Sequence, residues 1–286
     1  MNLTITCPAK VNLTLRVVGK RADGYHTLSS LVAFTDFGDA ITILPHQQDR
    51  FETSGMFAKA LGAREDNLAL KAARAMCKAT NRPHDFGIHL QKNIPIAAGL
   101  GGGSADAAGI VRALLSYWGL RLDEIKDFDG LLQSLGADVP VCFYGRPAMM
   151  ENIGDLITPL STFPECAILL INPFKACLTE DIFKTMSVPD KSPPPHPNIA
   201  RLEDLLSYMQ AHGNDMQPVA QKMIPEISGI IALLKKTKHC LYAGMSGSGA
   251  TCFGIFKNER ECEQARVEIV RGNQDIWCVS TKLTTQ

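Results

Sequence analysis

The chain has 286 residues, of which 45% are hydrophobic and 20% charged, and its formal net charge at pH 7 is zero. This size and composition predict a globular protein of one large or two ordinary domains and exclude a disordered chain. The balanced charge argues against a nucleic-acid-binding protein with a strongly basic face. No apolar run approaches membrane-spanning length, and the N-terminus lacks a signal-peptide pattern. Nine cysteines without a Cys-x-x-Cys pair indicate free thiols in a reducing cytoplasm rather than disulfides or a zinc site.

The first residues alternate between apolar and polar side chains, which predicts strands over residues 3–7 and 11–17. The period of two places Lys10, Asn12 and Thr14 on one face, opposite the apolar set. A lysine and an asparagine at the start of a strand suit either a solvated face or a site that holds a phosphate or hydroxyl group. The alternation alone favours the solvated face.

A turn with the dipeptide Asp23-Gly24 follows and is succeeded at once by Tyr25 and His26. These two residues either cover the hairpin or reach a ligand, because turn residues are well placed for binding. Further patterns predict strands over 28–34 and 40–44 and a helix over 67–80.

A glycine-rich stretch, residues 95–108, lies between a predicted strand at 86–91 and a helix whose apolar stripe ends at Trp118. Ser104 is the candidate N-cap of that helix. Free backbone N–H groups at a helix start attract anions, which favours a phosphate loop over a flexible connector. A Walker A loop would need a lysine before Ser104, and a dinucleotide fingerprint would need a third glycine there, so neither pattern is met.

Asp138 lies between a predicted helix over 122–135, which ends at Gly136, and an apolar segment that begins with proline. The ordinary interpretation of this aspartate is capping or turn chemistry. The functional interpretation is a carboxylate held at the edge of a rigid element, with its ionisation set by burial and a cationic partner.

The remaining chain predicts a second, smaller set of elements beyond a domain boundary near residue 160. Strands are predicted over 166–171 and 276–283, and helices start near Thr179, Leu202 and Pro225 and span 259–272. Residues 187–197 form an extended proline-rich loop. A second glycine loop, residues 244–251, links two strands, and two glycine loops suggest one site with contributions from both halves of the chain.

Three stretches together resemble the motifs of the GHMP small-molecule kinases. They are Pro8–Leu13, Pro95–Ala105 and Gly244–Ala250. Residues 19–28 and 135–140 are also similar to one member of that family, a kinase of isoprenoid precursor synthesis that acts on a cytidine diphosphate derivative. The resemblance covers nearly the whole chain. It implies a two-domain α+β fold with the active site in the inter-domain cleft, and we place the domains at residues 1–160 and 161–286.

The resemblance also implies roles for individual residues. Asp138 would be the catalytic base, with Lys10 as its charged neighbour. The loop would wrap the ATP phosphates with Pro95, Ile96, Ala97, Ala98, Gly99, Leu100, Gly101, Gly102, Gly103, Ser104 and Ala105. Ser104 would also approach the Mg²⁺ ion that accompanies ATP.

Substrate contacts are implied at four further positions. Tyr25 and Phe183 would sandwich the cytosine ring, His26 would hydrogen-bond its edge, and Asn12 would lie near the substrate diphosphate. Thr179 and Asn67 are further candidates, and the proline-rich loop matches no motif.

The expected protein is therefore a cytoplasmic kinase that uses ATP and Mg²⁺, acts on a small molecule, binds neither nucleic acid nor membrane, and is a monomer or weak homodimer. One alternative is a GHMP kinase for another alcohol, such as mevalonate, homoserine or a sugar. A second alternative is a nucleotide sensor without transfer activity, which would need neither Lys10 nor Asp138.

Overall fold

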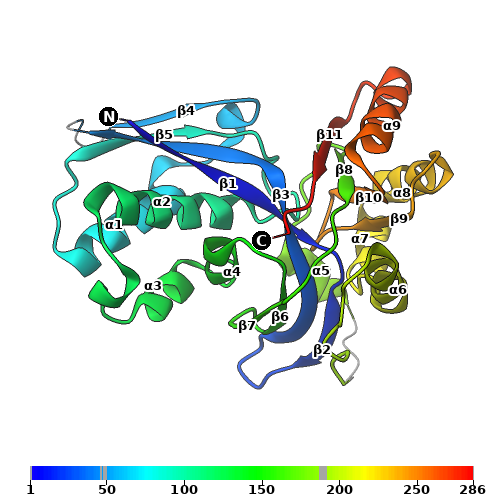
Figure 1. Ribbon diagram of the computed structural model, residues 1–286, viewed down its shortest axis with the longest axis horizontal. Helices are drawn as coiled ribbons and strands as arrows, with labels where there is room; N and C mark the ends of the chain where they lie inside the picture. Colours follow the sequence, from blue (N-terminus) through cyan, green and yellow to red (C-terminus); the bar gives the residue numbers. More distant parts are fainter. Residues whose placement is uncertain (1, 46, 48–49, 187–191, 286) are drawn as a thin grey trace. The chain divides into compact units, whose positions relative to one another are not determined.

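A computed structural model describes residues 2–45, 47, 50–186 and 192–285 (Figure 1). The chain forms two compact units, and each unit is assembled from separate segments. Unit 1 comprises Met1–Ala9, Gly38–Ile96 and Gly101–Gly145, whereas unit 2 comprises Lys10–Phe37, Ala97–Leu100 and Arg146–Gln286. The division into domains 1–160 and 161–286 stays a prediction, and neither compact unit is one continuous stretch.

The sheet of unit 1 is built around β5 (Phe86–Gln91). This strand pairs in parallel with β4 (Phe51–Ser54) and antiparallel with the second half of β3 (His26–Pro45), where Ala40 lies opposite Gln91. Strand β1 (Leu3–Asn12) also pairs with β3. Apolar side chains such as Ile41, Ile43 and Ile88 are fully buried along these strands and form the core under the helices.

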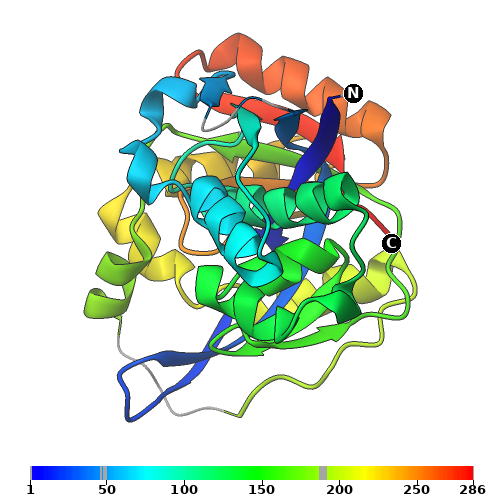
Figure 2. The ribbon, with the colours of Figure 1, turned by 90° about the vertical axis from the view of Figure 1, so that its left-hand side faces the viewer.

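The described residues of unit 1 also form four α-helices. They are α1 (Leu68–Thr80), α2 (Gly102–Trp118), α3 (Phe128–Leu135) and α4 (Val139–Tyr144), and short 3-10 segments lie at Ala58–Ala60, Arg64–Asp66 and Leu122–Glu124. Helix α1 begins at the Asn67 cap and packs against α2 (Figure 2). Helix α2 also lies next to β1, since the Arg112 guanidinium donates to the Thr6 carbonyl at 3.2 Å. The glycine loop therefore continues into a helix that is packed on several sides.

Unit 2 contains a four-stranded antiparallel sheet with the order β11-β8-β10-β9. The strands are β8 (Ala167–Asn172), β9 (Tyr242–Met245), β10 (Cys252–Phe256) and β11 (Trp277–Lys282). Strand β2 (Arg16–Lys20) forms a hairpin with β3, and β6 (Ala148–Asn152) pairs with β3 and with β7 (Leu156–Pro159).

The helices of unit 2 are α5 (Thr179–Thr185), α6 (Leu202–His212), α7 (Gln217–Met223), α8 (Glu226–Lys236) and α9 (Glu259–Gly272). Helices α8 and α9 pack against the four-stranded sheet. The predicted stripe Ile227, Ile230, Ile231 and Leu234 of α8 lies in one buried cluster with Leu169 of β8. Apolar spacing in the sequence thus identified the face of α8 that contacts the core.

Several predicted elements are confirmed and some are corrected. The strand at 86–91, the helices at 67–80, 202–209, 227–234 and 259–272, and the last strand are present. The predicted strands 3–7 and 11–17 are wrong in their division, because one strand runs through Pro8 to Asn12 and the next begins at Arg16. Strands 28–34 and 40–44 are likewise one 20-residue strand. Pairing between β1 and β3 outweighs the local signal for a break.

The predicted helix over 122–135 is interrupted. A 3-10 segment ends at Glu124, and α3 begins after Asp127, which has a left-handed backbone (φ 52°) and accepts a hydrogen bond from the Gly130 N–H at 3.3 Å. Aspartate is favoured at a helix N-cap because its side chain accepts a backbone N–H of the first turn. A new helix therefore begins after Asp127. Of the proline-rich stretch, residues 187–191 lie outside the described residues, and 192–197 have no regular secondary structure. In the described part of the chain, no helix has the length and apolar character needed to cross a bilayer.

Candidate active site

The glycine loop of residues 95–105 ends in α2 of unit 1. Gly101 has a left-handed backbone (φ 62°) and is the N-cap of α2, so the predicted N-cap at Ser104 is wrong. The helix begins two residues before Ser104, which places this serine in the first turn. The N–H groups of a first helical turn have no partner within their helix. In general, such N–H groups and the positive end of the helix dipole can together bind a phosphate group.

Gly102, the first residue of α2, lies close to its neighbours. A Cβ atom there would lie 3.0 Å from the Lys92 Nζ atom and 3.1 Å from Cγ2 of Ile94. The first turn of α2 therefore packs directly against the side chains of Lys92 and Ile94, which follow β5.

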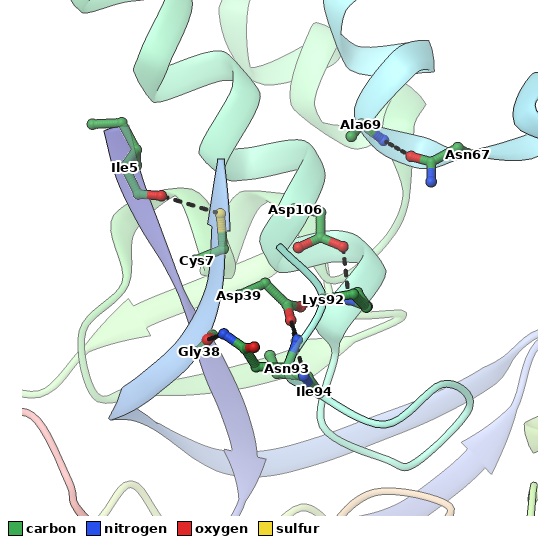
Figure 3. A network of polar contacts seen from close by, with 10 residues as sticks. All are labelled: Ile5, Cys7, Gly38, Asp39, Asn67, Ala69, Lys92, Asn93, Ile94 and Asp106. Atoms are coloured by element: carbon green, nitrogen blue, oxygen red, sulfur yellow. Dashed lines mark hydrogen bonds and ion pairs between the residues drawn. The ribbon is translucent and has the colours of Figure 1, made fainter. Parts of the chain in front are cut away.

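A buried cluster of charges supports this part of the loop (Figure 3). The Lys92 ammonium forms ion pairs with Asp39 and, at 2.7 Å, with Asp106. All three residues are at most 3% exposed. Asp39 also accepts hydrogen bonds through Oδ1 from the N–H groups of Asn93, at 2.5 Å, and Ile94, at 2.8 Å.

Burial shifts the pKa values of two members of this cluster, Asp106 and Lys92. Burial raises the pKa of the Asp106 carboxyl to about 8, with the Lys92 ammonium opposing and Asp39 adding to the shift. Burial acts to lower the pKa of Lys92, but the two carboxyl groups outweigh it and the pKa lies above its ordinary value. The sequence analysis missed this cluster. The only local signals were a lysine just before the loop and an aspartate within an alanine-rich helix.

In unit 2, the end of β1 brings the first motif against the middle of the glycine loop. The Lys10 N–H donates to the Leu100 carbonyl at 3.0 Å. The Asn12 N–H donates to the Ser246 hydroxyl at 3.0 Å, and that hydroxyl donates to the Gly99 carbonyl at 2.8 Å. Lys10 and Asn12 are only 3% and 2% exposed, so the solvated-face interpretation is wrong.

The second glycine loop lies against the same segment. The Thr251 N–H donates to the Ala98 carbonyl at 3.2 Å, and a Cβ atom on Gly99 would lie only 2.3 Å from the Ser246 carbonyl oxygen. Asn214 holds this second loop through hydrogen bonds of 2.8 Å to the carbonyls of Met245 and Gly247. Within unit 2, the structure therefore brings together parts of all three motifs that the sequence singled out.

The aromatic candidates lie near one another in unit 2. His26 is the first residue of β3, and its ring stacks on Phe183 of α5 with a centroid separation of 4.0 Å and an interplanar angle of 2°. Burial and then the nearby Lys20 lower the pKa of His26, which favours the neutral ring. Tyr25 precedes this pair and is 64% exposed. Its ring is accessible to a ligand.

Asp138 lies in unit 1 at the N-cap position of α4, where its side chain makes no capping hydrogen bond. The capping interpretation is therefore wrong. At the other end of α4, the Arg112 guanidinium of α2 donates to the carbonyls of Cys142, at 2.7 Å, and Phe143, at 3.2 Å. Helix α2, which follows the glycine loop, thus holds the helix that carries Asp138.

Two weaker candidates have local partners. The Asn67 side chain caps α1 by accepting the Ala69 N–H at 2.9 Å, and the Thr179 hydroxyl hydrogen-bonds to the Ser248 hydroxyl at 2.9 Å. Among the described residues, no group of three or more His, Cys, Asp or Glu side chains is arranged to hold a metal ion. The half-buried Ser104 in the first turn of α2 carries a hydroxyl oxygen, the kind of ligand that Mg²⁺ takes.

The chain belongs to the GHMP kinase family, a class of small-molecule kinases. Residues 67–146 match the description "GHMP kinases N terminal domain", and residues 195–273 match "GHMP kinases C terminal". The chain is therefore an ATP-dependent kinase.

Two similar proteins from other bacteria carry the same name. The chain is 41% identical over 281 residues to the 4-diphosphocytidyl-2-C-methyl-D-erythritol kinase of Parvibaculum lavamentivorans, covering 96% of both chains. It is 40% identical to the kinase of the same name from Paracoccus denitrificans, covering 96% of this chain and 95% of the other. A crystal structure of 4-(cytidine 5'-diphospho)-2C-methyl-D-erythritol kinase matches with a TM-score of 0.80 at 28% identity, covering 98% of this chain and 99% of that one.

Proposed function

We propose that this enzyme transfers the γ-phosphoryl group of ATP to the 2-hydroxyl of 4-diphosphocytidyl-2-C-methyl-D-erythritol. The products are the 2-phosphate and ADP, and the step belongs to the non-mevalonate route to isopentenyl diphosphate. The observation that carries the proposal is the junction of Lys10, Asn12, the glycine loop and the second glycine loop within unit 2. Relatives at about 40% identity that bear this kinase name support the choice of substrate.

Asp138 and Lys10 are the proposed catalytic pair. The substrate alcohol is too weak an acid to ionise at neutral pH, so a carboxylate must accept its proton as the bond to phosphorus forms. Such assistance contributes about a hundredfold to ten-thousandfold to the rate. The Lys10 ammonium would offset negative charge on the transferring group.

Binding of the nucleotide phosphates is assigned to residues 95–105. The first-turn N–H groups of α2 would bind the anion, and Gly99 and Gly102 allow close approach of neighbouring chain segments. Mg²⁺ bound to the phosphates would neutralise charge on the transferring group, with Ser104 as its proposed protein ligand. The chain itself mainly positions the two reactants, as is usual in phosphoryl transfer.

Recognition of the cytidine group is assigned to Tyr25, His26 and Phe183. The accessible Tyr25 ring and the Phe183 ring would hold the pyrimidine by stacking, which contributes about 1–3 kcal/mol per base. A neutral His26 has one ring N–H donor and one acceptor nitrogen, which suits the hydrogen-bonding edge of cytosine. Asn12 would lie near the diphosphate. We expect a monomer or weak homodimer that acts in the cytoplasm.

The test is a coupled ADP-release assay with ATP, Mg²⁺ and the cytidylyl methylerythritol substrate. The Asp138→Asn variant should lose about a hundredfold or more of kcat while still binding an ATP analogue, because the amide cannot accept the proton. The exposed Asp129→Asn variant of α3 is the matched control and should keep wild-type turnover.

Two results would count against the proposal. Turnover of homoserine or mevalonate in preference to the cytidine substrate would show that the enzyme has the activity of another GHMP kinase. Tight ATP binding without transfer to any of these alcohols would favour a nucleotide sensor.

A further inference from the structure

We propose that Lys92, Asp39 and Asp106 are positioning residues that hold both ends of the glycine loop in the geometry that binds nucleotide phosphates. The inference rests on the proposed function in one respect, namely that residues 95–105 bind ATP. The three side chains themselves are buried in unit 1.

The first contact fixes the chain where it approaches the loop. Asp39 of β3 accepts the N–H groups of Asn93 and Ile94, which immediately precede Pro95. The Lys92 N–H donates to the Ser54 carbonyl at 2.7 Å, which ties the same segment to the end of β4. The direction of the backbone at the start of the loop is thereby determined by β3 and β4 together.

The second contact fixes the chain where the loop becomes a helix. The Lys92 ammonium pairs with Asp106, which lies one turn into α2, at 2.7 Å. The same Nζ atom lies 3.0 Å from the position that a Cβ on Gly102 would occupy. One ammonium group therefore lies beneath the first turn of α2 and links it to Asp39 (Figure 3).

The composition of the cluster indicates a role in orientation rather than stability alone. Burying an ammonium and two carboxyl groups costs more than packing apolar side chains in the same volume. Within the described residues, Asp106 Oδ1 also lacks a hydrogen-bond partner, which adds to that cost. What the charged cluster provides and an apolar core does not is a set of directed bonds, each to a defined backbone or side-chain atom at the loop.

The experiment compares Asp39→Ala with Asp39→Asn in the full-length enzyme. The alanine removes the acceptor for the Asn93 and Ile94 N–H groups, whereas the asparagine keeps an acceptor oxygen there. We expect Asp39→Ala to raise KM for ATP about tenfold or more, since small displacements of a positioning segment have effects of that size. KM for the cytidine substrate should stay within about twofold of wild type, and Asp39→Asn should restore most of the ATP affinity.

Lys92→Met removes the shared cation, and we expect the same selective rise in KM for ATP. Lys71→Met is its control, because Lys71 of α1 makes only an exposed ion pair with Asp66, at 3.6 Å. Thermal melts set an assay temperature at which each variant is folded. If Asp39→Ala and Lys92→Met do not fold, Asp106→Ala is tested instead. It removes the acceptor that the Lys92 ammonium contacts in α2, and the same rise is expected in KM for ATP alone.

Two outcomes would overturn the inference. One is a folded Asp39→Ala or Lys92→Met enzyme with the wild-type KM for ATP. The other is an equal change in both KM values, which indicates a general structural role. Binding of a non-hydrolysable ATP analogue is measured on the same variants. Its affinity does not depend on which alcohol is the acceptor, so a failure of the proposed substrate remains distinguishable from a failure of this inference.

Discussion

Gly99 shows how one residue without a side chain permits the contact between the two glycine loops. Its backbone is left-handed (φ 75°), and a Cβ atom would lie 2.3 Å from the Ser246 carbonyl oxygen. That distance is shorter than any real Cβ contact, and the opposing atom belongs to the backbone, so one of the two loops would have to move. Alanine at this position therefore combines backbone strain with a steric clash.

We expect Gly99→Ala to lower the free energy of unfolding by about 2 kcal/mol or more and to raise KM for ATP about tenfold. Chemical denaturation and steady-state kinetics measure these two effects. Gly119→Ala is the matched control, because Gly119 has a similar backbone (φ 63°) and nothing within 4 Å of its Cβ position. Equal effects of the two substitutions would show that strain alone, without the clash, accounts for the change.

At the scale of elements, α4 depends on α2 for its placement. The Arg112 side chain satisfies two carbonyls at the C-terminal end of α4 and one carbonyl of β1. Lysine or arginine groups are favourable at this end of a helix, where carbonyls lack helical partners. Because Asp138 lies at the opposite end of this short helix, a shift of α4 moves the proposed base.

We expect Arg112→Met to reduce kcat about tenfold and to leave KM for ATP nearly unchanged. The loss of hydrogen bonds to partly buried carbonyls should also cost about 1–3 kcal/mol of stability. Stopped-flow or steady-state assays of the folded variant measure the first effect, with Arg74→Met on the exposed face of α1 as the control. A rise in KM for ATP with unchanged kcat would place the effect at the loop instead of at Asp138.

The elements that the sequence predicted well are those with strong local signals. The apolar stripe of α8, the strand before the glycine loop and the helix α1 all depend on residues close together in the chain. The Lys92 cluster was not predictable in this way, because its ion pairs join residues 53 and 14 positions apart. The continuous course of β1 and β3 escaped prediction for the same reason, since pairing between distant segments decides it.

The site residues also differ in whether a local motif or a long-range contact brings them to attention. Lys10, Asn12 and the two glycine loops were identified by motif, and their mutual contacts then emerged from the fold. The roles of Asp138, Tyr25, His26 and Phe183 stay predictions. The stacking of His26 on Phe183 joins residues from β3 and α5 that no local pattern connects.

On the scale of the whole molecule, the cysteines are distributed through both units as free thiols, six of them buried. Burial raises the pKa of Cys166 and of Cys252 to about 12, from an ordinary value of 9.0. In the unfolded chain these thiols ionise near their ordinary pKa, while the folded protein keeps them protonated. Above about pH 9 the unfolded state therefore binds fewer protons than the folded state. Because of this difference, the free energy of unfolding falls as the pH rises from about 9 toward 12.

We expect the urea midpoint to decrease between pH 8 and pH 10, and Cys166→Ala/Cys252→Ala to reduce the size of that decrease. Thiol reagents at pH 8 should modify these two residues at the rate of unfolding, because the native thiols are neutral and buried. Rapid modification of both in the folded enzyme would contradict the expectation.

The C-terminal strand region returns to the beginning of the chain. Thr284 donates its N–H to the Phe34 carbonyl at 2.8 Å, across a separation of 250 residues, and Leu283 forms a bridge with Thr35. Unit 1 uses no residue beyond Gly145, whereas unit 2 combines Lys10–Phe37 with Arg146–Gln286. During translation at about 5–20 residues per second, the β2–β3 hairpin therefore waits on the order of ten seconds after Gly145 for its last partners. Over that interval the strand edges that residues 283 and 284 later cover stay unpaired, and unpaired edges of this kind are prone to aggregation.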